Sequence, residues 1–188
     1  ILPENLVLRV QNEWEPKRDD LLLVAAKKYS KDNDAKIVLN YLLSQNIDIN
    51  TVSRSRNCLK IAIMNDDVEF VSLLLDHGAN VEKLPGLGMN PLIEALWYPR
   101  SNSERVCQLL LTHRNSKDVI DVNCFEENVS CDTALQFAAK HGYTNTMELL
   151  LSFPNIDINS SSRAGWTPFI SACAECNSFC VQLILQKA

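Results

Sequence analysis

The architecture of this chain can be read outward from residues 132–159, which are DTALQFAAKHGYTNTMELLLSFPNIDIN. Leu135 is followed three positions later by Ala138, and an aliphatic triplet begins at Leu149, 14 residues after Leu135. Apolar residues three and four positions apart share one face of a helix, so this spacing predicts two short amphipathic helices. The stretch closes with the segment 157–159, Asp-Ile-Asn, in which turn-forming residues flank one aliphatic residue. Such a segment is typical of a chain reversal.

The same pattern recurs through the sequence. The paired Leu/Ala anchors are Leu22/Ala25, Leu59/Ala62, Leu92/Ala95, Leu135/Ala138 and, with Phe for Leu, Phe169/Ala172. The aliphatic triplets begin at Tyr41, Leu73, Leu109, Leu149 and Leu183. In three of the five units the anchor and the triplet are the same 14 residues apart, a register that random apolar clustering would not keep. The closing segment also recurs, at 48–50, 80–82 and 121–123.

Each unit is predicted to be a pair of helices that depends on its neighbours. The small anchor Ala62 allows a neighbouring helix to approach closely, and Gly78 suits the left-handed end of the second helix. One such pair buries too little apolar surface alone, so the fold should exist only as a stack. The predicted repeats are residues 19–50, 51–82, 83–123, 124–159 and 160–188. Residues 1–18 do not fit the pattern and are interpreted as an N-terminal capping helix or the end of a preceding repeat.

These residues resemble the ankyrin-repeat family. The segment 165–169, Gly-Trp-Thr-Pro-Phe, is similar to the family's Gly-x-Thr-Pro-Leu signature, and residues 132–142 resemble its Thr-Pro-Leu-His-x-Ala-Ala-x-x-Gly run. Residues 71–80, VSLLLDHGAN, resemble the family's second helix and turn. The resemblance covers residues 19–188. It implies an all-α solenoid of stacked helix–turn–helix units with short hairpin turns.

Three departures from the family pattern are visible. Lys60, Ile93, Gln136 and Ile170 stand where the family has His. Extra residues around 30–34, 98–103 and 114–120 are expected to form exposed loops, because insertions in repeat arrays map to loops. The outer face of the last unit still carries apolar residues, from which we expect the array to continue beyond residue 188.

Composition excludes several classes of protein. The chain has 18 Lys and Arg against 23 Asp and Glu, so it lacks the basic excess typical of nucleic-acid binding. Its longest apolar runs are too short to cross a bilayer, so no direct membrane insertion is predicted. Seven cysteines, an odd number in a chain of this size, are interpreted as reduced thiols of a cytoplasmic or otherwise intracellular protein. Because no Met begins the chain, we expect it to be part of a larger multidomain protein.

The sequence predicts no enzyme, cofactor or metal site. His77, His113 and His141 fall at helix ends of different units, where they are expected to cap carbonyl groups. Cys173, Cys176 and Cys180 have a metal-like spacing but no fourth ligand nearby in sequence, so packing within the core is the preferred interpretation. A metal- or redox-responsive domain that uses these three thiols remains an alternative.

In the ankyrin-repeat family the partner is usually held on the concave face, by the hairpin tips and the outward side of the first helices. The resemblance places the following residues there: Lys27, Lys28, Arg54, Arg56, Met64, Leu87, Met89, Trp97, Tyr98, Lys140, His141, Arg163 and Trp166. Tyr, Trp, Arg and Met are the residue types that dominate binding hot spots. The aromatic residues could instead shield a loop or a hairpin, and the Lys and Arg of the first two units could form either a basic strip for an acidic peptide or a solvated face.

The preferred function is therefore a non-catalytic scaffold or adaptor module that binds a protein or peptide on its concave face. A different class of function is an intramolecular regulatory or targeting domain of a larger enzyme or channel.

Overall fold

The computed structural model describes residues 21–45, 47–52, 56–82, 90–115, 120–125 and 130–187. Within these ranges the chain folds into successive helix pairs: α2 (Leu21–Lys28) with α3 (Asn33–Ser44), α4 (Cys58–Met64) with α5 (Val68–Asp76), α6 (Pro91–Trp97) with α7 (Ser103–Thr112), α8 (Ala134–His141) with α9 (Thr144–Ser152), and α10 (Pro168–Ala174) with α11 (Ser178–Lys187). The prediction of an all-α array of stacked helix pairs is confirmed. The predicted capping segment, residues 1–18, lies outside the described residues.

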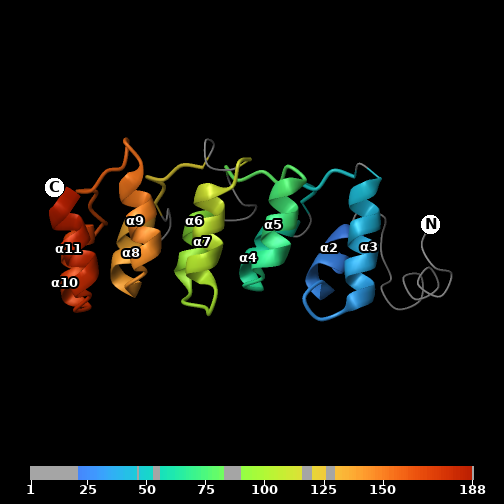
Figure 1. Ribbon diagram of the computed structural model, residues 1–188, viewed down its shortest axis with the longest axis horizontal. Coiled ribbons are helices and arrows are strands. Elements are labelled where there is room, and N and C mark those ends of the chain that lie inside the picture. The colour runs from blue at the N-terminus through green and yellow to red at the C-terminus, as the bar shows by residue number, and fades with distance from the viewer. Residues whose placement is uncertain are drawn as a thin grey trace.

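The helix pairs stand side by side in one row, with α2 and α3 near one end and α10 and α11 at the other (Figure 1). The first helices contact one another in the order α2, α4, α6, α8 and α10, and a second layer is formed by α5, α7, α9 and α11. The connections between units run along one edge of the row, which we call the hairpin edge. The turns within each pair lie along the opposite edge, the turn edge.

The repeated anchors form the core between the first helices. The five alanines predicted to allow close approach are at most 1% exposed: Ala25, Ala62, Ala95, Ala138 and Ala172. Where the first and second units meet, the rings of Tyr29 and Phe70 stack with their centroids 4.1 Å apart. The apolar contacts thus run from unit to unit without a break, as the stacking argument requires.

The recurring Asp-x-Asn segment ties two of the units to the units that follow them. In three units the Asp side chain accepts the backbone N–H two residues later, at 2.9 Å from Asn50 and Asn123 and at 3.0 Å from Asn159. The side chain of Asn123 then donates to the Asn155 carbonyl at 2.7 Å and accepts the Asp157 N–H at 2.8 Å. Asn50 makes the same pair of bonds to the following unit. The motif recognised in the sequence is therefore a clamp between hairpins.

Acidic side chains link the units along the turn edge. Neither α7 nor α9 has a side-chain cap of its own at its N-terminus. Asp66 accepts the Asn102 N–H at the start of α7 at 2.8 Å, and Glu104 accepts the Asn145 N–H in the first turn of α9 at 2.9 Å. A carboxylate there satisfies an unpaired N–H and meets the positive end of the helix dipole. Each of these second helices therefore depends on the unit before it.

The predicted insertions have different outcomes. Asn33 and Asp34 were expected in a loop but form the first turn of α3, because the Asp32 side chain accepts the Asp34 N–H at 3.0 Å and caps the helix. Residues 98–102 do form a turn between α6 and α7, and Tyr98 is exposed. In the third insertion, residues 116–119 lie outside the described part of the chain.

Candidate partner-binding surface

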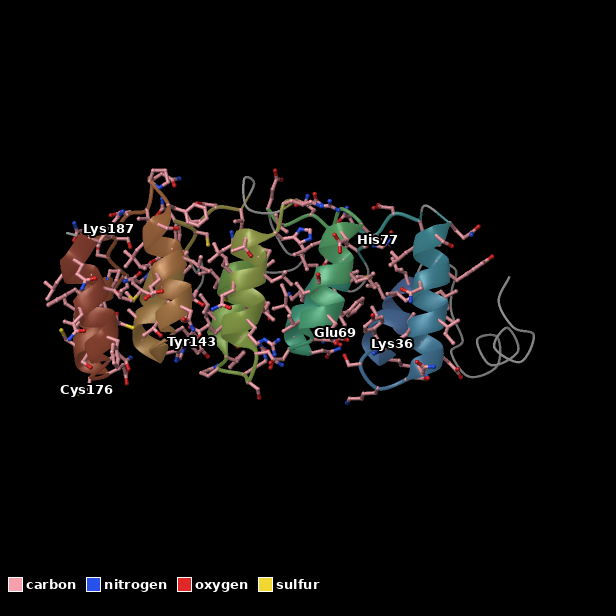
Figure 2. All side chains as sticks on the ribbon, viewed as in Figure 1. Lys36, Glu69, His77, Tyr143, Cys176 and Lys187 are labelled. Carbon is pink, nitrogen blue, oxygen red and sulfur yellow. The ribbon has the colours of Figure 1, made fainter. Side chains whose placement is uncertain are left out.

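The predicted partner-binding residues divide between the two edges of the array. Seven of them lie at the C-terminal ends of first helices, at the turn edge: Lys27, Lys28, Met64, Trp97, Tyr98, Lys140 and His141. Arg56, Arg163 and Trp166 precede first helices, at the hairpin edge. Figure 2 labels the nearby Tyr143 at the turn edge and His77 at the hairpin edge. Arg54, Leu87 and Met89 lie outside the described residues.

The expected basic strip is not continuous among the described residues. Lys27 and Lys28 end α2 at the turn edge, whereas Arg56 comes before α4 at the hairpin edge. Even the seven residues of α4 give a rise of roughly 10 Å, about one Debye length in physiological salt. Arg56 and the two lysines therefore lie at opposite edges of the array and do not form one local basic strip.

Aromatic contacts across α6 and α8 bring together three of the predicted residues, Trp97, Tyr98 and His141. Trp97 contacts Tyr98 edge-on, with ring centroids 6.3 Å apart, and reaches Phe137 of the next unit at 5.7 Å. Phe137 stacks on His141 at 6.3 Å, and His141 lies 5.7 Å from Tyr143. We call these five residues the aromatic row. These separations are in the range of favourable aromatic pairs, so the row is one packed unit.

The aromatic row is buried at its centre and open at one end. Phe137 is buried, Trp97 and His141 are half-buried, and Tyr98 is 61% exposed. The Arg100 guanidinium lies over the Tyr98 ring at 5.8 Å from its centroid, a cation–π geometry. Trp97 packs against Phe137 of the next unit, a contact that the sequence did not predict, yet part of its surface stays open beside Tyr98. An anchored, partly exposed aromatic pair is suited to contact a partner at little entropic expense.

His141 takes part in this row as a neutral ring. Burial lowers its pKa first of all, and the Lys140 ammonium lowers it further, against an opposing effect of Glu175. The prediction that His141 caps a carbonyl is wrong, because the ring stacks between Phe137 and Tyr143. For His77 the same prediction is confirmed, since Nδ1 lies 2.8 Å from the Leu73 carbonyl oxygen. The His113 ring lies 3.3 Å from Asp76 of the preceding unit.

Glu94 adjoins the aromatic row and was missed in the sequence. It lies one helical turn before Trp97 on α6, at the register position that Ile61 and Phe137 occupy in the neighbouring units. Glu94 is only 8% exposed, and its carboxylate has no hydrogen-bond or ion-pair partner among the described residues. An acidic residue two positions after the anchor Leu, where the neighbouring units have Ile and Phe, was the available signal.

The hairpin edge carries a second, more polar surface. A pocket of about 530 Å³ is lined by residues of the last two hairpins, among them Phe125, Thr133, Asp157 and Arg163. The Arg163 N–H donates to the Ser130 carbonyl at 2.7 Å, and the Trp166 carbonyl accepts the Gln136 side chain. The Trp166 ring itself is 45% exposed. The backbone contacts at this edge join hairpins, and the exposed rings lie apart from the aromatic row.

All seven cysteines are free thiols. No three His, Cys, Asp or Glu side chains come together to hold a metal ion in the part of the chain that the structure describes. Cys180 is buried as predicted, whereas Cys173 and Cys176 are exposed, which contradicts the core-packing prediction for these two thiols. The equivalent Ala139 is covered by α10, but no described residue covers Cys173. Burial raises the pKa of Cys58 to about 12, so that thiol is inert.

Among the described helices, none is long and apolar enough to cross a membrane.

Comparison with known proteins identifies a matching family and several relatives. The family model for ankyrin repeats (three copies) matches residues 22–123 and 100–188. The chain is 33% identical over 112 residues to SMC5-SMC6 complex localization factor protein 1 of Bos taurus, covering 59% of this chain and 10% of that protein. The Homo sapiens protein of that name is 40% identical over 81 residues, 43% of this chain and 8% of its own length. Palmitoyltransferase AKR1 of Lachancea kluyveri is 28% identical over 167 residues, 88% of this chain and 21% of that protein.

Proposed function

We propose that this chain binds a segment of another protein along the concave side of α6 and α8, because the chain belongs to the ankyrin-repeat family and carries an open aromatic row there. Ankyrin repeats are generally protein–protein interaction modules, and the family is generally non-catalytic. The concave location and the scaffold or adaptor role are our proposal.

The observation that carries the proposal is the exposure of Tyr98 beside Trp97. A stack needs buried apolar side chains, but it does not need a ring that is 61% exposed at the end of α6. Trp97 is fixed by Phe137, so little side-chain entropy is lost when a partner covers the pair. An extended peptide can follow the row from Tyr98 towards Tyr143, and so contact two units at once.

The proposal can be tested with a phage-displayed library of random 12-residue peptides selected on the folded chain. We expect Tyr98→Ala to weaken the selected peptides by about tenfold or more, the usual loss at a hot spot. The matched control is Phe179→Ala on α11, which removes an aromatic ring that is 71% exposed but lies outside the row. Far-UV circular dichroism of both variants should equal that of the wild type. Failure to select any peptide, or selected peptides that bind Tyr98→Ala at full strength, would refute the proposal.

A targeting or regulatory role within a larger protein is a second candidate. The relatives from Bos taurus and Homo sapiens are named for the localization of a complex, and this chain spans a tenth or less of their length. The match to the palmitoyltransferase likewise covers about a fifth of that enzyme. Fusion of residues 1–188 to a fluorescent protein tests this candidate. A wild-type fusion that concentrates at a cellular site, and a Tyr98→Ala fusion that spreads evenly, would support it, and identical distributions would oppose it.

A further inference from the structure

Glu94 is an acid that is only 8% exposed and has no side-chain partner among the described residues, at a register position where the neighbouring units have Ile61 and Phe137. Its neighbours on α6, Ile93 and Leu96, are fully buried, and Trp97 lies one turn further on. The buried side chains Asn57, Asn90 and Gln136, at the caps and on the first helices, each make a hydrogen bond. Gln136, for example, accepts the Thr133 N–H at 2.7 Å and donates to the Trp166 carbonyl.

The Glu94 carboxylate contributes no hydrogen bond or ion pair to the stack among the described residues. The side chain is 8% exposed and its oxygens are not closed off from solvent, so a ligand can reach them. Arg100 comes near, but its Nη1 lies 3.5 Å from the backbone carbonyl oxygen of Glu94 and makes no ion pair with the carboxylate. An acidic residue at a position where the neighbouring units have Ile61 and Phe137, one turn before the partly exposed Trp97–Tyr98 pair, is a local departure from the repeat pattern of the kind expected at a binding site.

We infer that the bound segment inserts a Lys or Arg side chain between Glu94 and the Trp97–Tyr98 pair. This inference rests on the proposed function and specifies the chemistry of its ligand. A cationic head would supply charge-assisted hydrogen bonds to the carboxylate, and the aromatic faces would cover its aliphatic stem. The position of Arg100 over Tyr98 demonstrates that this ring accepts a cation. The partner is therefore a basic segment, in contrast to the acidic peptide that the sequence suggested for Lys27, Lys28, Arg54 and Arg56.

The test extends the 12-residue library selection to Glu94→Gln, which keeps the size of the side chain and removes its charge. Peptides selected on the wild type should share one Lys or Arg. Replacing that residue by norleucine should weaken binding about tenfold or more on the wild type and have little further effect on Glu94→Gln. The matched control is Glu148→Gln, which neutralises an exposed acid on α9. It should bind every selected peptide as the wild type does.

The outcomes separate the two claims. Peptides that lose binding to Tyr98→Ala, but lack a common basic residue and bind Glu94→Gln unchanged, would overturn the inference and leave the proposed function standing. Peptides indifferent to Tyr98→Ala would overturn both. The free protein gives an independent readout, because an unpaired carboxylate predicts that Glu94→Gln and Glu94→Leu melt no lower than the wild type. A clearly lower melting temperature for both variants would show that Glu94 serves the fold, and would also overturn the inference.

Discussion

Helices α6 and α8 occupy the same place in neighbouring units, yet among the described residues the buried polar side chain of α8 is hydrogen-bonded and that of α6 is not. Helix α8 begins with a capping box, in which Thr133 and Gln136 satisfy each other's backbone N–H groups. It ends at Gly142 in the left-handed conformation, φ 70°. Helix α6 begins with an Asn90 cap but ends at Tyr98 in an extended conformation, without a glycine. Gln136 on α8 is fully bonded, whereas Glu94 on α6 has no partner among the described residues.

This difference distinguishes residues that stabilise the stacked helices from residues that are available to bind a partner. Helix α8 follows the repeat pattern at its cap, its anchors and its C-terminus, and its polar groups bind the next hairpin. Helix α6 keeps the anchors Leu92 and Ala95, both buried, but departs from the pattern at Glu94, Trp97 and Tyr98. Local departures from a consistent pattern are expected at functional sites, because there the requirements of folding and binding conflict.

The largest expected loss of stability follows from replacing Gln136, the hydrogen-bonded residue of α8 in this comparison. Gln136→Ala removes two hydrogen bonds in a site where Gln136 is 1% exposed. The Thr133 N–H loses its side-chain partner, whereas the Trp166 carbonyl keeps only its bond from the Ser162 N–H at 2.9 Å. We expect the free energy of unfolding to fall by about 2–4 kcal/mol, the sum of a lost cap and an unsatisfied buried group. Urea denaturation followed by circular dichroism measures this loss.

Glu94→Gln, which changes the side chain of α6 that makes no hydrogen bond to the described residues, serves as the control for Gln136→Ala. If stability follows burial alone, both substitutions should destabilise the array to a similar degree. The structure predicts a loss at Gln136 and none at Glu94. Equal losses at the two positions would mean that α6 and α8 do not differ in the way described.

The sequence contained most of what determines stacking, because stacking contacts repeat with a fixed register. The anchor alanines and the Asp-x-Asn clamps follow from spacing alone, since each unit meets the next in the same way. The aromatic row did not follow, because Trp97 and Phe137 are 40 residues apart and meet only once α6 and α8 are placed side by side. The partner-binding residues were chosen by their register, which combined residues of opposite edges. That choice passed over Glu94 and Phe137, whose register position is buried in four units and half-buried at Val24 in the first.

A smaller effect is expected at the C-terminal ends of the first helices. Gly142 has φ 70°, and a Cβ there would lie 2.9 Å from Asn177 Oδ1, so Gly142→Ala should cost about 1–2 kcal/mol. At the equivalent position of the last unit, Cys176 adopts φ 58°, a conformation that favours glycine. Cys176→Gly should therefore stabilise the protein by roughly 0.5–1 kcal/mol. Thermal unfolding by calorimetry measures both changes.

Cys176→Ala is the control for the gain at this position. Alanine removes the thiol but keeps a Cβ in the left-handed conformation, so it should melt close to the wild type. A gain from Cys176→Ala equal to that from Cys176→Gly would assign the effect to the sulfur atom and not to the backbone.

The smallest expected effect concerns pH and the α8 end of the aromatic row. Burial lowers the pKa of His141 in the folded state, so the unfolded chain takes up a proton more readily than the folded chain does. The stabilisation by the neutral ring is complete above the unfolded value of about 6.5, and it is lost as the pH falls towards the lower folded value. His141→Gln removes this contribution, so its urea midpoint should decline less than that of the wild type between pH 7.5 and 5.5. The difference between the two declines isolates His141 from carboxylates that titrate in both proteins. Equal declines would show that the ring is solvated and does not belong to a packed aromatic row, and the continuity between α6 and α8 on which the binding surface depends would then end at Phe137.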